Sequence, residues 1–513
     1  MRIEDRASWR RAPSMTWSPQ QIANRFGRTD DKPSLLVAED ESHIPEAVEL
    51  PCSCTVSWIN YAGAASLVGT TLVLSRIDLP VTTVALTTLT VAALTIIILE
   101  NMFMGPRIAF RPATSRGYRA AQIGASPLRR VALKLVGLTA SIAALALIYW
   151  LFPIYRATGA KDLFSLTQRL WLPFLICTPL YVWYVDKKSV EPEDSFFHLG
   201  LLCTGYWNVV DLELIKQHCL QWLVKAFFLP LIVGFYFGYL VWLPKQPFDV
   251  DVMAFAANPS SVNWLRISDF LVKYLFMIDV GFGCIGYLLT LKLLDAEVRS
   301  TEPKLLGWLV CIACYAPFWG LISENYLKYG SGTLWDVWLA DWPTVKVIWS
   351  VLILMLTLVY LSATIQFGIR FSNLTHRGII TNGPYRWLKH PAYLAKNLNW
   401  WLIYLPFLSS VGFSESVRLS ALLVGVNIIY YLRAKTEEAH LSVDPIYLQY
   451  IQFMRNNDLF ASPRRIFVRR VQRLQAAGNR STRTQQECSV ITPRGATSFQ
   501  PGSADISTRA SSS

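Results

Sequence analysis

Ten long apolar segments set the strongest limit on how this chain can fold. They cover roughly residues 56–75, 80–100, 131–153, 168–185, 220–243, 268–292, 305–323, 345–367, 391–411 and 418–434. About twenty consecutive apolar residues are enough for an α-helix to cross a bilayer, where backbone polar groups must be bonded within the segment. The sequence therefore predicts an all-α, polytopic integral membrane bundle with about ten transmembrane helices.

The composition also indicates a membrane protein. Of the 513 residues, 53% are hydrophobic and only 16% are charged, whereas soluble proteins carry about 25% charged residues. The net charge of +13 gathers in the C-terminal tail and in alternate connections, which is typical of membrane orientation rather than of nucleic-acid binding. We therefore expect membrane lipids as partners, and no nucleic acid.

Connections that are rich in basic residues alternate with connections that have few of them. The connection after the first segment has only Arg76, and the one near Gly412 has none, whereas the N-terminal segment and the C-terminal tail are rich in arginine. The connection after the second segment is also rich, with Arg107, Arg111, Arg116, Arg119, Arg129 and Arg130. Because Lys and Arg are retained on the cytoplasmic side, we expect a multi-pass protein with both termini in the cytoplasm.

A polar loop interrupts the apolar pattern before the ninth segment. Residues 376–397 read HRGIITNGPYRWLKHPAYLAKN. The Gly-Pro-Tyr sequence that begins at Gly383 predicts a tight turn. A proline favours an extended conformation in the residue before it, here His390, and Pro391 suits the first position of a new helix. The free N–H groups at that helix start are able to bind an anion, so the sequence predicts a site at this helix mouth.

Hydrogen-bonding side chains surround the predicted turn. Arg386, Lys389 and His390 can donate to a bound anion, and Tyr393 follows His390 by three residues. The alternative interpretation is an ordinary basic loop that only holds the topology. Two prolines, one histidine and two tyrosines within ten positions exceed what orientation requires. We therefore favour a binding site on the cytoplasmic side.

A second polar block ends the last apolar segment, with Arg433, Glu437 and Glu438. Arg433 and Glu437 are i, i+4 neighbours on a helix. Facing the loop across a cleft, a glutamate can accept hydrogen bonds from the ammonium group of a cofactor with an amino-acid end. Arg433 can bind the carboxylate of that cofactor or position an anionic acceptor. Glu437 and Glu438 differ in direction by about 100°, so both cannot point equally into the cleft, and the sequence leaves open which one does.

The two blocks GPYRWLKHPAYLAKN and RAKTEE together resemble the C-terminal signature of the isoprenylcysteine carboxyl methyltransferase superfamily, over residues 349–460. Members of that superfamily are integral-membrane enzymes that use S-adenosylmethionine. This chain departs from the signature at Lys389, where arginine is usual, and at Ala395, where glycine is usual and which Lys396 follows. The resemblance implies that His390, Pro391, Tyr393 and one glutamate contact S-adenosylmethionine.

From the residues and the resemblance together we take Arg433, Glu437 and Glu438 as candidate catalytic residues. The candidate cofactor-binding residues are Gly383, Tyr385, Arg386, Lys389, His390, Pro391, Tyr393, Asn397, Glu437 and Glu438. We expect no metal site, because Cys311 and Cys314 lack a second pair or a nearby histidine.

Asp279 is a candidate for a substrate cavity. It lies in the middle of an apolar segment, where a carboxylate costs at least a few kcal/mol unless it is paired or protonated. Lys225 and Lys273 are possible partners. The alternative interpretation is a neutral carboxyl group that is hydrogen-bonded between helices.

Three classes of function fit these patterns. The first is a membrane S-adenosylmethionine-dependent methyltransferase that acts on a lipophilic, isoprenoid- or lipid-linked acceptor. The second is an NADPH-dependent sterol or isoprenoid double-bond reductase, because those enzymes also have about ten spans and a C-terminal His-Pro-x-Tyr block. The third is a non-enzymatic lipid transporter or binding protein, which Asp279 would suit. The Glu437–Glu438 pair favours the methyltransferase.

The chain is predicted to have four parts. Residues 1–50 form a cytoplasmic N-terminal segment, residues 51–340 a transmembrane region of unknown role, residues 341–460 a methyltransferase-like membrane domain, and residues 461–513 a basic, largely disordered cytoplasmic tail. Within the tail, apolar residues and arginines interleave over Arg464–Leu474. That pattern predicts a short interfacial helix attracted to anionic lipid.

Overall fold

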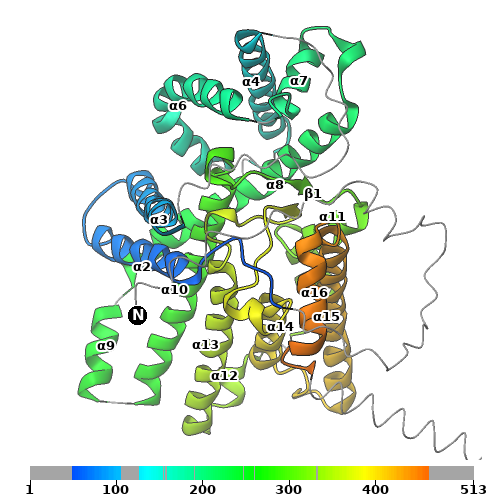
Figure 1. Ribbon diagram of the computed structural model, residues 1–513. Helices are drawn as coiled ribbons and strands as arrows, with labels where there is room; N and C mark the ends of the chain where they lie inside the picture. Colours follow the sequence, from blue (N-terminus) through cyan, green and yellow to red (C-terminus); the bar gives the residue numbers. More distant parts are fainter. Residues whose placement is uncertain are drawn as a thin grey trace, which may run out of the picture. The chain divides into compact units, whose positions relative to one another are not determined.

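The computed structural model describes residues 49–104, 126–153, 155, 159–189, 191–246, 248–258, 260–330 and 333–461. The predicted N-terminal segment, except its last two residues, and the predicted interfacial helix lie outside these residues. The chain divides into two units, Met1–Val48 and Glu49–Ser513, and all the described residues belong to the second. Helices form nearly all of its regular structure (Figure 1). The expectation of an all-α membrane bundle is confirmed.

Six of the described helices are long and apolar enough to cross a membrane. They are α3 (Val81–Met104), α4 (Pro127–Leu151), α8 (Leu212–Trp242) with the 3-10 turn η4 (Leu243–Lys245), α10 (Ser261–Leu288), α13 (Pro343–Ile365) and α15 (Phe413–Leu441). The chain is therefore a multi-pass membrane protein.

The expected number of ten spans is only approximate. The first and fourth predicted segments are helical, as α2 (Ser57–Leu74) and α6 (Ala160–Lys188). The seventh is divided into α11 (Leu305–Ile312) and the π-helix η6 (Gly320–Leu327), with Pro317 between them. The ninth, α14 (Pro391–Tyr404), ends where Leu405 adopts a left-handed conformation at φ 43°. Proline cannot continue the backbone ladder and a left-handed residue leaves the helix, so both segments are shorter than their hydropathy implies.

Short elements complete the chain. They are α7 (Ser195–Cys203), η3 (Trp207–Val209), α9 (Phe248–Ala257), η5 (Lys292–Leu294), α12 (Trp335–Trp338), η7 (Gly368–Arg370), η8 (Gly383–Arg386) and α16 (Pro445–Asn457). The two-residue strands β1 (Ser300–Thr301) and β2 (Thr375–His376) pair in antiparallel fashion. Several helix starts have the expected side-chain caps; for example, Asp211 accepts a hydrogen bond from the backbone N–H of Glu213 at 2.9 Å.

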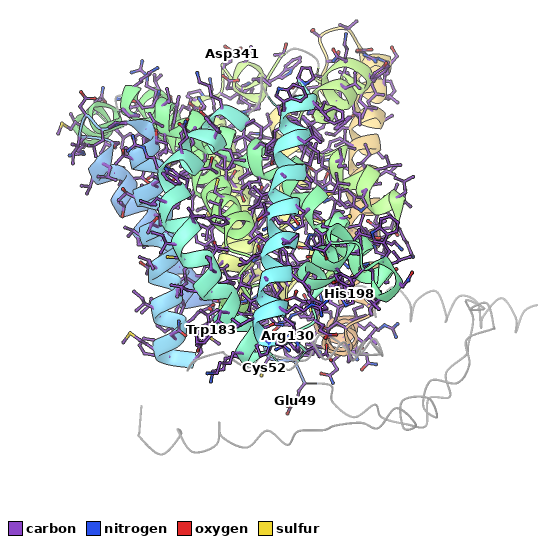
Figure 2. All side chains as sticks on the ribbon, turned by 90° about the horizontal axis from the view of Figure 1, so that it is seen from above. Glu49, Cys52, Arg130, Trp183, His198 and Asp341 are labelled. Atoms are coloured by element: carbon purple, nitrogen blue, oxygen red, sulfur yellow. The ribbon has the colours of Figure 1, made fainter. Side chains whose placement is uncertain are left out.

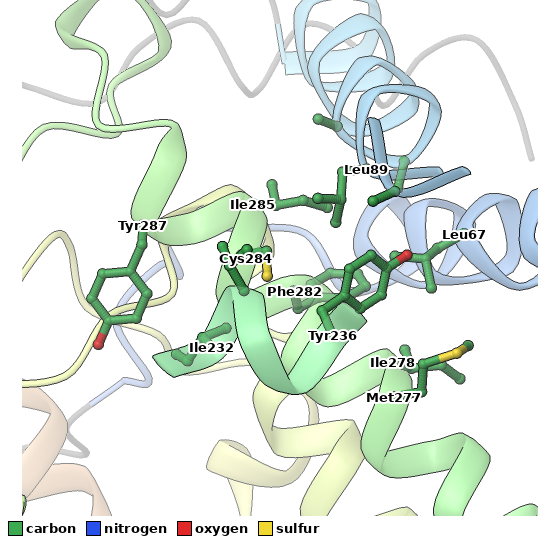
Figure 3. Close-up of a cluster of buried hydrophobic side chains, with 14 of the residues drawn as sticks. Leu67, Leu89, Ile232, Tyr236, Met277, Ile278, Phe282, Cys284, Ile285 and Tyr287 are labelled. Carbon is green, nitrogen blue, oxygen red and sulfur yellow. The ribbon is translucent and has the colours of Figure 1, made fainter. Parts of the chain in front are cut away.

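The helices pack in a connected series. Helix α2 packs on α3, α8 on α10, α10 on α13, and α13 on α14. Helix α4 packs on α6 and α7, and its contact with α7 is close: a Cβ added at Gly137 would lie 2.1 Å from the carbonyl oxygen of Phe196. Figure 3 shows a cluster of buried side chains from several of these helices, which includes Leu67, Leu89, Ile232, Tyr236, Met277 and Phe282.

The outer faces of the spanning helices are apolar. On α13, Ile348, Leu352 and Met355 are 55%, 45% and 56% exposed, and their spacing places them on one face of the helix. Such a face suits contact with lipid, because lipid chains offer no hydrogen-bonding partners and apolar side chains need none. Figure 2 shows Asp341 at one end of the helices, with Cys52 and Arg130 at the opposite end.

Two buried arginines fix the connection between α13 and α14. Arg370 forms an ion pair with Glu100 of α3 at 2.9 Å, and the two side chains are 1% and 7% exposed. Arg377 donates to several backbone carbonyls, including those of Gly286 and Leu289 at 2.7 Å each. Buried cations require such partners. The two arginines therefore hold this connection against α3 and α10.

The chain before α2 holds the same connection from its other side. The backbone N–H of Cys54 donates to the carbonyl of Ile379 at 2.9 Å, and the Asn382 amide donates to the carbonyl of Thr55 at 2.8 Å. The loop that carries the predicted helix mouth therefore lies at the end of the helices where Cys52 lies (Figure 2).

Candidate functional site

A cavity of about 140 Å³ lies between the connection that follows α13, the start of α14, the second half of α15, and α11. Its volume is enough for on the order of ten water molecules. Aromatic and ionisable side chains predominate among the residues that line it, which include Tyr315, Tyr360, Tyr385, His390, Tyr393, Lys396, Tyr430, Arg433, Glu437 and His440.

The predicted helix mouth forms one wall of the cavity. The turn η8 begins at Gly383, whose φ of +55° favours glycine, and a Cβ there would lie 2.6 Å from the Gln366 side chain. Helix α14 begins at Pro391, as expected from the sequence, and His390 precedes it. The carbonyl of Tyr385 accepts a hydrogen bond from the Tyr450 hydroxyl at 2.6 Å, so α16 supports the turn from behind.

Burial shapes the chemistry of Tyr385. Removal from water raises the pKa of its hydroxyl well above the ordinary value of 10, and the Glu437 carboxylate raises it further. Both causes disfavour the phenolate. Tyr385 therefore presents a neutral hydroxyl group to the cavity.

Glu437 is the glutamate that faces the cavity. Its Oε2 accepts a hydrogen bond from the Tyr393 hydroxyl at 2.7 Å, and both residues line the cavity wall. This hydrogen bond joins α14 to α15. The Glu437 carboxylate can still accept further hydrogen bonds.

Glu438 points in a different direction and does not line the cavity. It accepts from Lys389 Nζ at 2.7 Å and Lys435 Nζ at 2.9 Å, and its Oε1 lies 3.2 Å from His390 Nε2. Glu438 therefore ties the loop before α14 to α15 and orients His390, whose ring stacks on Tyr393 with centroids 5.4 Å apart.

Arg433 is a buried cation of the site, with 8% of its surface exposed. Its Nη2 donates to Asn373 Oδ1 at 2.8 Å and to the Tyr315 hydroxyl at 3.3 Å, and the guanidinium lies over the Tyr393 ring at 4.9 Å. Among the described residues it forms no ion pair with Glu437. A guanidinium has five N–H donors, so Arg433 can still bind an anion in the cavity.

The structure brings five of the candidate residues together in the cavity wall: Tyr385, His390, Tyr393, Arg433 and Glu437. The others lie around them. Gly383 and Pro391 shape the turn and the helix start, Lys389 and Glu438 pair with each other, and Arg386 is exposed. Asn397 accepts a hydrogen bond from Asn427 at 2.6 Å, which joins α14 to α15.

Asp279 lies behind the wall rather than in it. Its Oδ2 accepts a hydrogen bond from the Tyr360 hydroxyl at 2.8 Å, and Tyr360 lines the cavity. The two lysines considered as partners bond elsewhere: Lys225 donates to Thr290 at 2.6 Å, and Lys273 pairs with Asp269 at 2.7 Å.

Sequence reasoning missed several residues of the cavity wall. Asn373, Tyr315 and Tyr360 give no local signal: Tyr315 and Tyr360 belong to elements outside the two sequence blocks, and Asn373 lies just before the first of them. Lys396 was noted only as the residue that follows the departure at Ala395. Cys311 lines the cavity, but no group of three or more His, Cys, Asp or Glu residues that could hold a metal occurs within the described part of the chain.

Residues 345–443 match the model of the isoprenylcysteine carboxyl methyltransferase family. The match covers the polar loop of residues 376–397, called the motif loop below, together with α14 and α15. It confirms that this C-terminal part resembles the family. It supports a membrane methyltransferase. No curated protein and no solved structure matches the chain.

Proposed function

We propose that this protein is a membrane-embedded S-adenosylmethionine-dependent methyltransferase that acts on a lipophilic, isoprenoid- or lipid-linked acceptor. The main support is the cavity in which Glu437, Arg433 and His390 converge, inside the part of the chain that matches the family. Each of these groups comes from one of the two sequence blocks that carry the resemblance.

The charges of the cavity suit the amino-acid end of the cofactor. Glu437 carries a carboxylate that can accept hydrogen bonds from an ammonium group. Arg433 and the free N–H groups at the start of α14 can donate to a carboxylate. The half-buried carboxylate of Glu437 and the buried guanidinium of Arg433 in one cavity fit a zwitterion, because each opposite charge of the ligand finds a partner.

S-adenosylmethionine supplies an activated methyl group, so the protein's task is to align the acceptor and exclude water. The ring of Tyr393 stacks on His390 and also contacts the Arg433 guanidinium, and the aromatic side chains of Tyr360 and Tyr430 limit the space open to water. Lipid-facing helices such as α13 offer a lipophilic acceptor a route from the bilayer.

We place the cavity on the cytoplasmic side. Its loop contacts residues 51–55 and lies at the end of the helices that carries Cys52 and Arg130 (Figure 2). This is the end that the distribution of basic residues assigns to the cytoplasm, where a nucleotide-derived cofactor is present.

Titration calorimetry tests the proposal. S-adenosylmethionine and NADPH are titrated separately into the purified full-length protein, and into Glu437→Gln and Glu415→Gln. We expect the wild type to bind S-adenosylmethionine, and Glu437→Gln to weaken binding about ten- to a hundredfold, because a charge-assisted hydrogen bond contributes roughly 1.5–3 kcal/mol. Glu415→Gln, at the exposed start of the same helix, should match the wild type.

Binding of NADPH in place of S-adenosylmethionine would move the assignment to a reductase. Binding of neither cofactor would favour a lipid transporter or lipid-binding protein.

A further inference from the structure

Arg433 is held in the cavity wall by neutral groups. Its Nη2 donates to Asn373 Oδ1 at 2.8 Å and to the Tyr315 hydroxyl at 3.3 Å, and within the described residues its Nε and Nη1 donate no hydrogen bond. The buried Arg370, in contrast, is paired with the Glu100 carboxylate at 2.9 Å. A carboxylate partner neutralises a guanidinium, whereas neutral oxygens orient it and leave its charge in place. The charge of Arg433 and its remaining donors are therefore available to a ligand in the cavity.

The side chain of Asn373 has a single orientation that satisfies its neighbours. Because arginine carries only donors, Oδ1 has to face Arg433, and Nδ2 then faces the Tyr287 hydroxyl, to which it donates at 2.9 Å. The backbone N–H of Asn373 donates to the same hydroxyl at 2.8 Å. The Tyr315 hydroxyl donates to Oδ1 at 3.1 Å. These hydrogen bonds fix the amide and, through it, the guanidinium of Arg433.

The groups that anchor Asn373 come from helices before the part of the chain that matches the family, which begins at residue 345. Tyr287 belongs to α10 and is buried, and Tyr315 follows α11. The fully buried Phe228 of α8 stacks on Tyr287 with centroids 5.7 Å apart and meets the edge of Tyr315 at 4.9 Å. The two tyrosines are therefore packed against one aromatic ring, and α8, α10 and the end of α11 together set where Asn373 lies.

The backbone at Asn373 is held in place as well. Leu374, the next residue, adopts a left-handed conformation with φ 59°, which is unfavourable for a residue with a Cβ. Its carbonyl accepts a hydrogen bond from the Glu302 N–H at 2.8 Å, on the β1 side of the small sheet. Such a conformation persists only where the surrounding contacts enforce it. The hydrogen bonds to Tyr287 and Glu302, on either side of this turn, supply those contacts.

We infer that Asn373, anchored by Tyr287 and Tyr315, positions Arg433 to bind the carboxylate at the amino-acid end of the cofactor. This inference rests on the proposed function. Asn373 acts through Arg433 and is therefore a positioning residue. The helices that precede the matched part thus complete the cofactor site, because they fix the residue that orients its buried cation.

Titration calorimetry with two probes tests the inference: S-adenosylmethionine, and decarboxylated S-adenosylmethionine, which lacks only the carboxylate. Each is titrated into the purified full-length protein. The wild type should bind S-adenosylmethionine about ten- to a hundredfold more tightly, because the decarboxylated form cannot accept a charge-assisted hydrogen bond from Arg433. Asn373→Ala should lose this preference and keep its affinity for the decarboxylated form, whereas a general loss of structure would weaken both probes alike.

Two variants that keep the size of the side chain decide the matter if Asn373→Ala does not fold. Asn373→Asp still accepts a hydrogen bond from Arg433, but its carboxylate repels that of the cofactor, so the decarboxylated form should become the tighter ligand. Tyr287→Phe removes the hydroxyl that anchors the amide and should reduce the preference. The matched controls Asn101→Ala and Tyr326→Phe change exposed residues that do not line the cavity and should behave as the wild type.

Equal affinities of the wild type for the two probes would overturn the inference. An undiminished preference for S-adenosylmethionine in a folded Asn373→Ala or Asn373→Asp would do the same, and so would an equal loss of affinity for both probes in Asn373→Ala.

Failure of the proposed function gives a different result, because the wild type then binds neither probe. In that case the thermal unfolding midpoints of Asn373→Ala, Arg433→Met and the double variant decide whether Asn373 holds the arginine. A double variant whose midpoint shift equals the larger single shift shows that the two residues act as one unit. A shift equal to the sum of the two single shifts shows that they are independent and overturns the positioning role.

Discussion

At the scale of single residues, two adjacent glutamates have different environments. Glu437 accepts a hydrogen bond from a tyrosine hydroxyl in the cavity, whereas Glu438 does not line the cavity and contacts Lys389, His390 and Lys435. Carboxylates one position apart on a helix point in directions about 100° apart. One residue is therefore available to a ligand, and the other joins two parts of the protein.

This difference predicts a structural effect for Glu438→Gln. The substitution removes the charge that holds the lysines and His390, so the free energy of unfolding should fall by about 1–3 kcal/mol. Thermal unfolding in detergent, followed by tryptophan fluorescence, measures the change. Affinity for S-adenosylmethionine should fall less than in Glu437→Gln, and a larger fall would show that Glu438 is the residue that contacts the cofactor.

At the scale of elements, the connection between α13 and α14 depends on Arg370. Its partner Glu100 belongs to α3, and both side chains are buried. Removal of one member of a buried pair costs about 3–5 kcal/mol, because the other charge remains buried without a partner. The motif loop is therefore coupled to a helix 270 positions earlier in the sequence.

Arg370→Met should lower the thermal unfolding midpoint strongly, because Glu100 is left charged and unpaired. The double variant Arg370→Met with Glu100→Gln should recover a large part of the loss, since no unpaired charge remains. A double variant as unstable as Arg370→Met alone would show that the backbone contacts of Arg370, and not the ion pair, stabilise the loop.

Helix α16 offers a test of pH dependence. Asp444 caps its first turn by accepting from the Ile446 N–H at 2.8 Å, and its Oδ2 lies 3.2 Å from His376 Nε2 in the motif loop. Burial alone would raise the pKa of Asp444, but the hydrogen bonds from His376 and Ile446 outweigh burial, so the pKa is lowered. The ionised form is therefore favoured in the folded protein.

A lowered pKa in the folded state stabilises the protein above the unfolded pKa of about 4, and this contribution is lost as the pH falls through the folded pKa. The difference in unfolding midpoint between the wild type and Asp444→Asn should therefore shrink as the pH falls below about pH 4. A difference that grows below about pH 4 would contradict this assignment.

At the scale of the whole molecule, the two ends of the helices should face opposite sides of the membrane. Asp341 lies at one end and Cys52 at the other (Figure 2), and the exposed Arg386 belongs to the loop that contacts residues 51–55. Arg386→Cys should react with an impermeant thiol reagent from the cytoplasmic side, and Asp341→Cys only from the opposite side.

Both variants are made in a background without the other exposed cysteines, so that each signal reports on one position. If Arg386→Cys and Asp341→Cys were labelled from the same side, the chain between these two positions would not cross the membrane as expected. Reversed labelling would place the cavity away from the cytoplasm, where the cofactor is not available.

The sequence by itself determined the features that depend on local physics. Apolar runs predicted a helical membrane protein, because a backbone in lipid must satisfy its own hydrogen bonds. Pro391 predicted the start of α14 and Gly383 the turn before it, and the structure confirms both. Hydropathy was less reliable for the number of spans, because it does not register where the helix is interrupted between α11 and η6 or ends at Leu405.

Only the tertiary structure decided which groups share the cavity. Spacing along α15 showed that the two glutamates diverge, but the neighbours that distinguish them come from α14 and its loop. Asn373 reaches Arg433 across 60 positions, and Tyr360 reaches Asp279 across 81. The three aromatic rings under Lys396 Nζ likewise come from three helices, α13, α14 and α15. A helical pattern specifies the direction in which a side chain leaves its own helix, whereas its partner depends on how the helices pack.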